Sequence, residues 1–122
     1  MSSEKGLVKT LRKKNKFNAK MERGRSKKER ERAAELKLME RAGLIHNLSE
    51  QVRFVLIPAQ HDENGKMVLQ RAEYWADFTY YDADGNFVVE DVKGYKGGDA
   101  YKLYLLKKKL MYRDRKILIK ET

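Results

Sequence analysis

The sequence lacks cysteine and contains only one proline, two histidines and no long apolar run. Without cysteine, disulfide bonds, thiolate zinc sites and cysteine nucleophiles are excluded, and any metal ion must be bound mainly by carboxylates. No segment approaches the roughly 18 consecutive apolar residues of a membrane-spanning helix, and the basic N-terminus lacks the apolar stretch of a secretory signal. We therefore expect a cytoplasmic protein.

Acidic residues are scarce in the first quarter of the chain. The chain has 122 residues, enough for one domain, and a net charge of +10. Residues 1–32 contain 13 Lys and Arg against 4 Glu, so nearly all the excess charge lies there. We interpret residues 1–25 as a basic, flexible arm that binds phosphates, with a merely solubilising arm as the alternative, and residues 26–122 as the folded domain. The arm's nucleic-acid-binding candidates are Arg12, Lys13, Lys14, Lys16 and Lys20.

The rest of the sequence alternates between helical and strand patterns. The first expected helix spans residues 26–43, with Ser26 as its N-cap and Gly43 at its end, and the second spans residues 100–112, with Asp99 as its N-cap. The pattern predicts strands over residues 51–58, 73–81, 86–93 and 116–120, with 67–69 extending a hairpin. The sequence therefore predicts an α/β fold (α+β, mixed sheet) in the order αβββαβ, with the last strand parallel to the third.

Strand alternation brings charged side chains of the central hairpin together. Asp91 and Lys93 share one face of the third strand, and the turn at 82–85 brings Asp77 within reach of Asp91. Two carboxylates at one site are costly without a cation, and hard oxygen ligands favour Mg²⁺ or Mn²⁺. The alternative is a solvent-facing Asp77 and a weak Asp91–Lys93 surface pair. Glu90 lies on the opposite face, which favours a structural or supporting role.

These residues, together with Glu29 on the first helix, resemble the PD-(D/E)XK nuclease superfamily. The segments NKFNAK (15–20), SKKE (26–29), ADF (76–78) and EDVKG (90–94) look like a phage and prophage family within that superfamily. The resemblance covers nearly the whole chain and implies a restriction-endonuclease-like core. It also implies a bacterial or phage-infected host cell.

The resemblance implies a metal-dependent endonuclease that hydrolyses DNA phosphodiester bonds. In this interpretation Asp77 and Asp91 bind the metal, the backbone carbonyl of Val92 adds a ligand, and Glu29 supports the site. Lys93 lies next to the attacking water, where we expect it to act through its charge rather than as a general base. Glu29 fits a capping box with Ser26 equally well, so both roles remain open.

Lys107 and Lys108 of the second helix are further candidates for DNA contact, and the helix also carries Tyr101 and Tyr104. These tyrosines either stack on an unpaired base or, as helical aromatics more often do, pack against the sheet. The expected partner is double-stranded or branched DNA, such as a Holliday junction, bound by a homodimer by analogy with small phage nucleases. Two other functions remain open, a non-catalytic nucleic-acid-binding protein and an interaction protein that recruits an acidic partner.

Overall fold

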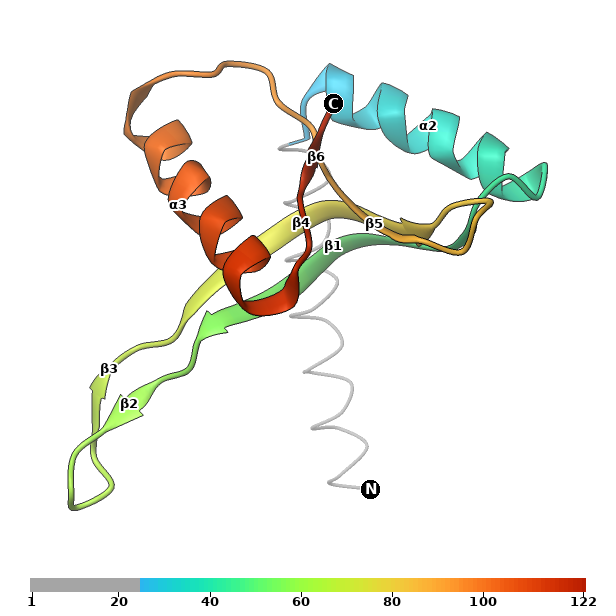
Figure 1. Ribbon diagram of the computed structural model, residues 1–122. Coiled ribbons are helices and arrows are strands. Elements are labelled where there is room, and N and C mark those ends of the chain that lie inside the picture. The colour runs from blue at the N-terminus through green and yellow to red at the C-terminus, as the bar shows by residue number, and fades with distance from the viewer. Residues whose placement is uncertain (1–24) are drawn as a thin grey trace, which may run out of the picture.

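The computed structural model describes residues 25–122; the arm residues 1–24, including the five predicted phosphate contacts, lie outside this range. Over these described residues the fold is α+β, as predicted, with two helices and a mixed four-stranded sheet. No helix in residues 25–122 is long and apolar enough to cross a membrane. The elements are α2 (Lys27–Arg41), β1 (His46–Ile57), β2 (Gln60–His61), β3 (Met67–Leu69), β4 (Ala72–Tyr81), β5 (Phe87–Asp91), α3 (Gly98–Arg115) and β6 (Lys120–Glu121) (Figure 1).

The sheet has the strand order β1-β4-β5-β6. β4 pairs antiparallel with both β1 and β5, whereas β6 lies parallel to β5, because the chain crosses over through α3 between them. The parallel placement of the last strand is thus confirmed. β1 begins five residues earlier than predicted and runs to the residue before Pro58, which cannot donate to a ladder.

Helix α2 packs on the sheet through one apolar cluster. Ser26 is its N-cap, and the Ser26 hydroxyl accepts a hydrogen bond of 3.1 Å from the backbone N–H of Glu29. After the C-cap, Gly43 adopts a left-handed conformation (φ +78°), the predicted glycine end of the helix. The cluster beneath α2 contains Ala33, Leu36, Ile45, Phe78, Tyr80 and Val92.

Helix α3 covers a second apolar cluster, which lies over other parts of the same sheet. The predicted N-cap, Asp99, is wrong: the cap is Gly97, and Asp99 lies in the first turn, where its charge favours the helix dipole. The end of the Tyr95 ring lies over Gly97, where an added Cβ would come within 2.7 Å of it, so a larger residue there requires this exposed ring to move. The second cluster contains Leu56, Tyr74, Ala76, Val89, Tyr104, Met111 and Ile119.

Strand β5 ends at Asp91, two residues earlier than predicted. Beyond Asp91, the Val92 N–H donates a hydrogen bond to the side chain of Asp77, and the Lys93 N–H donates one to the carbonyl of Thr122. The last strand is also short, because only Lys120 and Glu121 pair with β5. Strand pairing therefore stops where the candidate site begins.

A small hairpin made of β2 and β3 continues from the ends of β1 and β4 and projects away from both helices (Figure 1). Asp62 closes its turn by accepting hydrogen bonds from the backbone N–H groups of Asn64 and Lys66. The hairpin forms a separate two-stranded sheet, so its side chains receive no cover from the core.

Candidate active site

Asp91 and Lys93 form the centre of the candidate site at the end of β5. The Lys93 Nζ lies 2.8 Å from Asp91 Oδ1, so the predicted proximity of these two side chains is confirmed. The other carboxylate oxygen of Asp91 accepts a 2.7 Å hydrogen bond from the hydroxyl of Tyr74 on β4. Asp91 is only 6% exposed, so both partners offset the cost of burying its charge.

Asp77 joins this pair from the neighbouring strand. The β4–β5 register ends with Phe78 paired to Glu90, and extending it by one residue places Asp77 opposite Asp91. One oxygen of Asp77 accepts a 2.7 Å hydrogen bond from the Val92 N–H, and the other a 3.3 Å bond from the side-chain amide of Gln51. The carboxylates of Asp77 and Asp91 are therefore brought together as the sequence predicted.

Burial raises the pKa of Asp77 to about 6, because the charged form is poorly solvated there. This value of about 6 also includes the hydrogen bonds from the Val92 N–H and Gln51, which lower the pKa, and the negative charges of Asp91 and Glu29, which raise it. A carboxylate in this environment is stabilised by a cation. The electrostatics of the site therefore favour the binding of positive charge.

Glu29 reaches the site from the first turn of α2. Its carboxylate does not complete a reciprocal capping box in the described part of the chain; instead Oε2 lies 3.8 Å from Nε of Arg25. Arg25 also pairs at 2.9 Å with Glu50. On the same helix, the Lys28 ammonium donates a 2.6 Å hydrogen bond to the Lys93 carbonyl and thereby ties α2 to the end of β5.

Tyr104 of α3 supports Lys93 from the opposite side. The Lys93 Nζ lies 3.4 Å from the centroid of the Tyr104 ring, a cation–π contact that holds the ammonium against Asp91. Tyr104 is 6% exposed, so stacking of this ring on a base is excluded and packing is confirmed. Within residues 25–122 its hydroxyl has no hydrogen-bond partner, although it lies near Glu121.

Glu90 lies in a separate cluster under α2. It is fully buried, and the Arg32 guanidinium donates two hydrogen bonds to it, at 2.9 and 2.8 Å. The Tyr80 hydroxyl donates another. Burial acts to raise the pKa of Glu90, but the hydrogen bonds from Arg32 and Tyr80 outweigh it and hold that pKa below its ordinary value. Glu90 is thus separated from Lys93, as strand alternation predicted.

Asp77 and Asp91 are the residues of the site that could hold a hard cation. Asp77 and Asp91 are adjacent carboxylates, and each of their oxygens keeps acceptor capacity beyond the one hydrogen bond described. In residues 25–122 no group of three or more His, Asp or Glu side chains is arranged to hold a metal ion. A cation here would therefore need backbone oxygens and water in addition to the two aspartates.

The two lysines predicted to contact DNA on α3 are both half-buried. Lys108 Nζ lies 3.5 Å from Glu121 Oε2, so its charge is partly neutralised within the domain. Asp91 and Glu121 are paired in the β5–β6 register, which places this ion pair one strand away from the candidate site.

The sequence comparison identifies a family. A family model described as "Protein of unknown function (DUF1064)" matches residues 10–120. The chain belongs to this family. The DUF1064 match contains α2, α3 and every candidate site residue from Glu29 to Lys93, together with the arm from residue 10 onward. No curated protein and no solved structure matches the chain.

Two site residues of this DUF1064 chain, Gln51 and Tyr74, were not identified from sequence. Tyr104 was identified, but its contact with Lys93 was not. Gln51 occupies a left-handed conformation (φ +52°) within β1, which is unusual for a non-glycine residue and is shared by Asn47 in the same strand. No local sequence signal marks it, because its role depends on the strand register that brings β1 beside Asp77. The sequence left Tyr104 between base stacking and packing against the sheet, and it assigned no role to Tyr74.

Proposed function

We propose that the chain is a metal-dependent endonuclease that hydrolyses DNA phosphodiester bonds at Asp77, Asp91 and Lys93, with Mg²⁺ or Mn²⁺ as cofactor. The observation that carries this proposal is the convergence of the buried Asp91 carboxylate, the half-buried Asp77 carboxylate and the Lys93 ammonium where strand pairing ends, with a pKa of about 6 for Asp77. Perturbed carboxylates of this kind gather at functional sites, where substrate or metal replaces missing solvation. Membership of the PD-(D/E)XK superfamily is part of the same proposal.

Each residue has a role that follows from its contacts. Asp77 and Asp91 provide the oxygen ligands for the cation, the Val92 N–H and Gln51 orient Asp77, and Tyr74 orients Asp91. Lewis-acid activation of water and neutralisation of phosphate charge are what Mg²⁺ or Mn²⁺ supplies when bound. Lys93, fixed by Asp91 and Tyr104, presents a positive charge to the phosphate.

The charge distribution supports DNA as the substrate. The net charge of +10 favours a polyanion, and counterion release gives such binding a strong dependence on salt. A preference for branched DNA is part of the proposal by analogy only.

A cleavage assay tests the proposal. Full-length protein is incubated with linear, nicked, single-stranded and four-way-junction DNA, with Mn²⁺, with Mg²⁺ and with chelator. We expect cleavage that needs the cation and is lost in Asp77→Asn, whereas Asp84→Asn, an exposed turn carboxylate, retains it. DNA binding of Asp77→Asn, measured at two salt concentrations, should persist. Cation-independent cleavage, or equal activity in Asp77→Asn, would contradict the assignment.

One observation favours the non-catalytic DNA-binding protein as a second candidate. Asp91 is already neutralised by Lys93 and hydrogen-bonded by Tyr74, an arrangement that also suits a structural buried carboxylate. The two candidates differ in the same assay: a non-catalytic binder shows salt-dependent DNA affinity but no cleavage of any substrate with either cation.

A further inference from the structure

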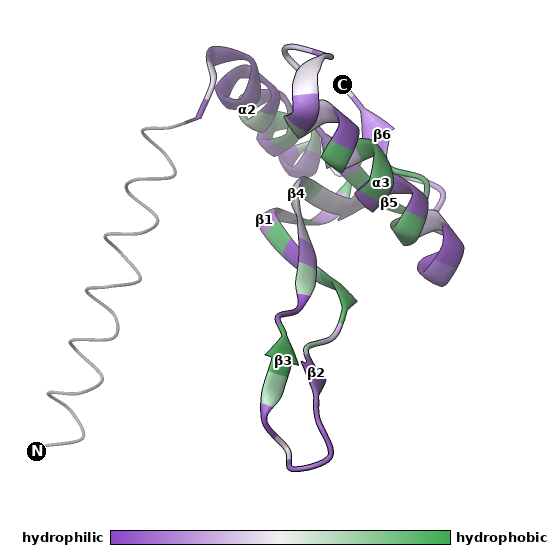
Figure 2. Ribbon diagram, turned by 90° about the vertical axis from the view of Figure 1, so that its left-hand side faces the viewer, coloured by the Kyte–Doolittle hydropathy of each residue, from purple (hydrophilic) through white to green (hydrophobic). Residues whose placement is uncertain are grey.

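The β2–β3 hairpin presents an apolar surface outside the core. Met67, Val68 and Leu69 are 49%, 56% and 56% exposed, so every residue of β3 faces solvent to a large extent. In Figure 2, β3 is coloured as hydrophobic and the connecting turn as hydrophilic. An isolated two-stranded hairpin is only marginally stable in water, and exposed apolar clusters mark interaction sites. The hairpin is therefore a surface that needs a partner.

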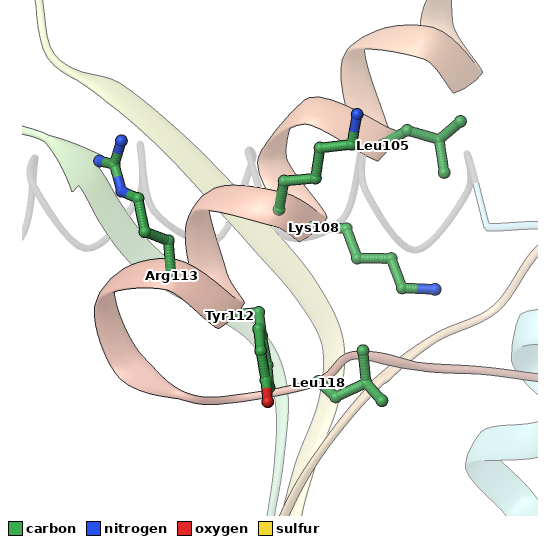
Figure 3. A pocket seen from close by; sticks show the side chains of 6 residues that line it. Leu105, Lys108, Tyr112, Arg113 and Leu118 are labelled. Carbon is green, nitrogen blue, oxygen red and sulfur yellow. The ribbon is translucent and has the colours of Figure 1, made fainter.

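A complementary surface lies on the C-terminal half of α3. A hollow of about 590 Å³ is lined by apolar groups of Leu105, Tyr112 and Leu118, and the last two are 52% and 68% exposed. Figure 3 shows these side chains together with Lys108 and Arg113, and Lys109 completes the lining. The hollow therefore combines an apolar floor with a basic rim, at a size that accepts a few side chains.

The charges on the two surfaces are opposite. The hairpin turn carries Asp62 and Glu63 against one lysine, Lys66, and is net acidic, whereas the rim of the hollow is basic. Within residues 25–122, neither Glu63 nor Lys109 forms an ion pair, and both are exposed. Two copies of a chain with a net charge of +10 repel each other unless an acidic patch meets a basic one, which the hairpin turn provides.

We propose that a second copy of this chain occupies these surfaces, so that the hairpin of each copy docks in the α3 hollow of the other. Two equivalent contacts related by a two-fold axis form a closed dimer and cover both apolar surfaces at once. DNA is a poor occupant of the hairpin, because the acidic turn repels phosphates. This dimer does not depend on the proposed nuclease activity.

The association state of the full-length protein, measured by sedimentation or light scattering, tests the dimer. We expect a dimer for the natural chain, and monomers for Leu69→Glu on the hairpin and Leu118→Glu in the hollow. The matched control Leu38→Glu changes an equally exposed leucine on α2 (62% exposed) and should leave the dimer intact. Circular dichroism confirms that each variant is folded.

Charge reversal tests the pairing of the two surfaces. Glu63→Lys and Lys109→Glu should each weaken association by roughly 5- to 10-fold, and the double variant should recover most of the loss. Because the chain has no cysteine, mixing Glu63→Cys protein with Lys109→Cys protein under oxidation should yield a disulfide-linked pair. A monomeric natural chain, a dimer insensitive to Leu69→Glu and Leu118→Glu, or hairpin variants that only weaken DNA binding would each overturn the proposal.

Discussion

Two buried carboxylate clusters lie at neighbouring places in one sheet and differ in how completely their charges are satisfied. The Glu90 carboxylate under α2 accepts two hydrogen bonds from the Arg32 guanidinium and one from the Tyr80 hydroxyl. These bonds hold the pKa of Glu90 below its ordinary value. Asp77 receives only one amide N–H and a long contact from Gln51, and its pKa rises to about 6. A satisfied cluster contributes to stability, whereas an under-satisfied one keeps binding capacity. This difference supports the proposed functional role of Asp77 and a structural role for Glu90.

The largest expected effect concerns activity. Asp91→Asn should lower the rate of metal-dependent DNA cleavage by at least about 10³-fold, because one of two carboxylate ligands and the partner of Lys93 are lost. Glu90→Gln, the adjacent residue, should stay within about threefold of the natural rate if the protein is folded, since Glu90 lies in the other cluster. Both are measured by single-turnover cleavage with Mn²⁺. Equal losses in the two variants would remove the distinction between the clusters.

For the free energy of unfolding, the larger effect should come from the Glu90 cluster. Arg32→Ala should lower the free energy of unfolding by about 3 kcal/mol, since it leaves Glu90 buried without its counter-charge. Lys27→Ala removes an exposed ion pair with Glu31 on the same helix and should cost less than about 0.5 kcal/mol. Urea denaturation of both variants measures the contrast. A small effect of Arg32→Ala would show that Glu90 is neutral or rehydrated in the folded protein.

The two clusters should affect the pH dependence of stability in opposite directions. The pKa of Asp77 is about 6 in the folded protein and 3.8 ordinarily. Its contribution to the free energy of unfolding is therefore fully present below about pH 4 and is lost as pH rises through 6. Asp77→Asn should therefore match the natural protein near pH 4 and exceed its free energy of unfolding by about 2–3 kcal/mol at neutral pH. Urea titrations of both proteins at several pH values measure this. Glu90 acts oppositely, because its lowered pKa makes its contribution disappear in acid.

Saturating Mn²⁺ should reduce or reverse this difference, because the cation stabilises only the protein that has both aspartates. Asp84→Asn, in an exposed turn, controls for general effects of charge and should show no such pH dependence. If Asp77→Asn were destabilised at neutral pH, Asp77 would belong with Glu90 as a structural carboxylate.

The smallest expected effect belongs to the positioning of Lys93 by Tyr104. Tyr104→Phe retains the ring under the ammonium and should retain the cleavage rate, whereas Tyr104→Leu should lose roughly 5- to 10-fold in kcat with little change in KM. Thermal unfolding of both variants controls for packing, because Tyr104 lies in the apolar cluster under α3. A similar kcat for the two variants would show that the ring only fills space.

Much of the fold was predictable from sequence because its signals are local. Ser26 and Gly43 bound the first helix, and the turn at residues 82–85 fixed the central hairpin, so the proximity of Asp77 and Asp91 followed from strand alternation. The N-cap of α3 was misplaced because the cap, Gly97, has no capping side chain, so no capping pattern marks it in the sequence. The exposure of the β2–β3 hairpin was also not predicted, because the apolar sequence of β3 does not indicate whether the strand is buried or exposed.

By itself, the sequence determined the order of the two helices and the main strands, the antiparallel hairpin and the proximity of Asp91 to Lys93. Only the tertiary structure decided that Gln51 reaches Asp77 across 26 positions, that Arg32 reaches Glu90 across 58, and that the Tyr104 ring lies against Lys93. Helix caps, turns and alternation depend on residues near one another in the chain. Strand register and helix docking depend on the packing of the whole domain, which no local pattern encodes.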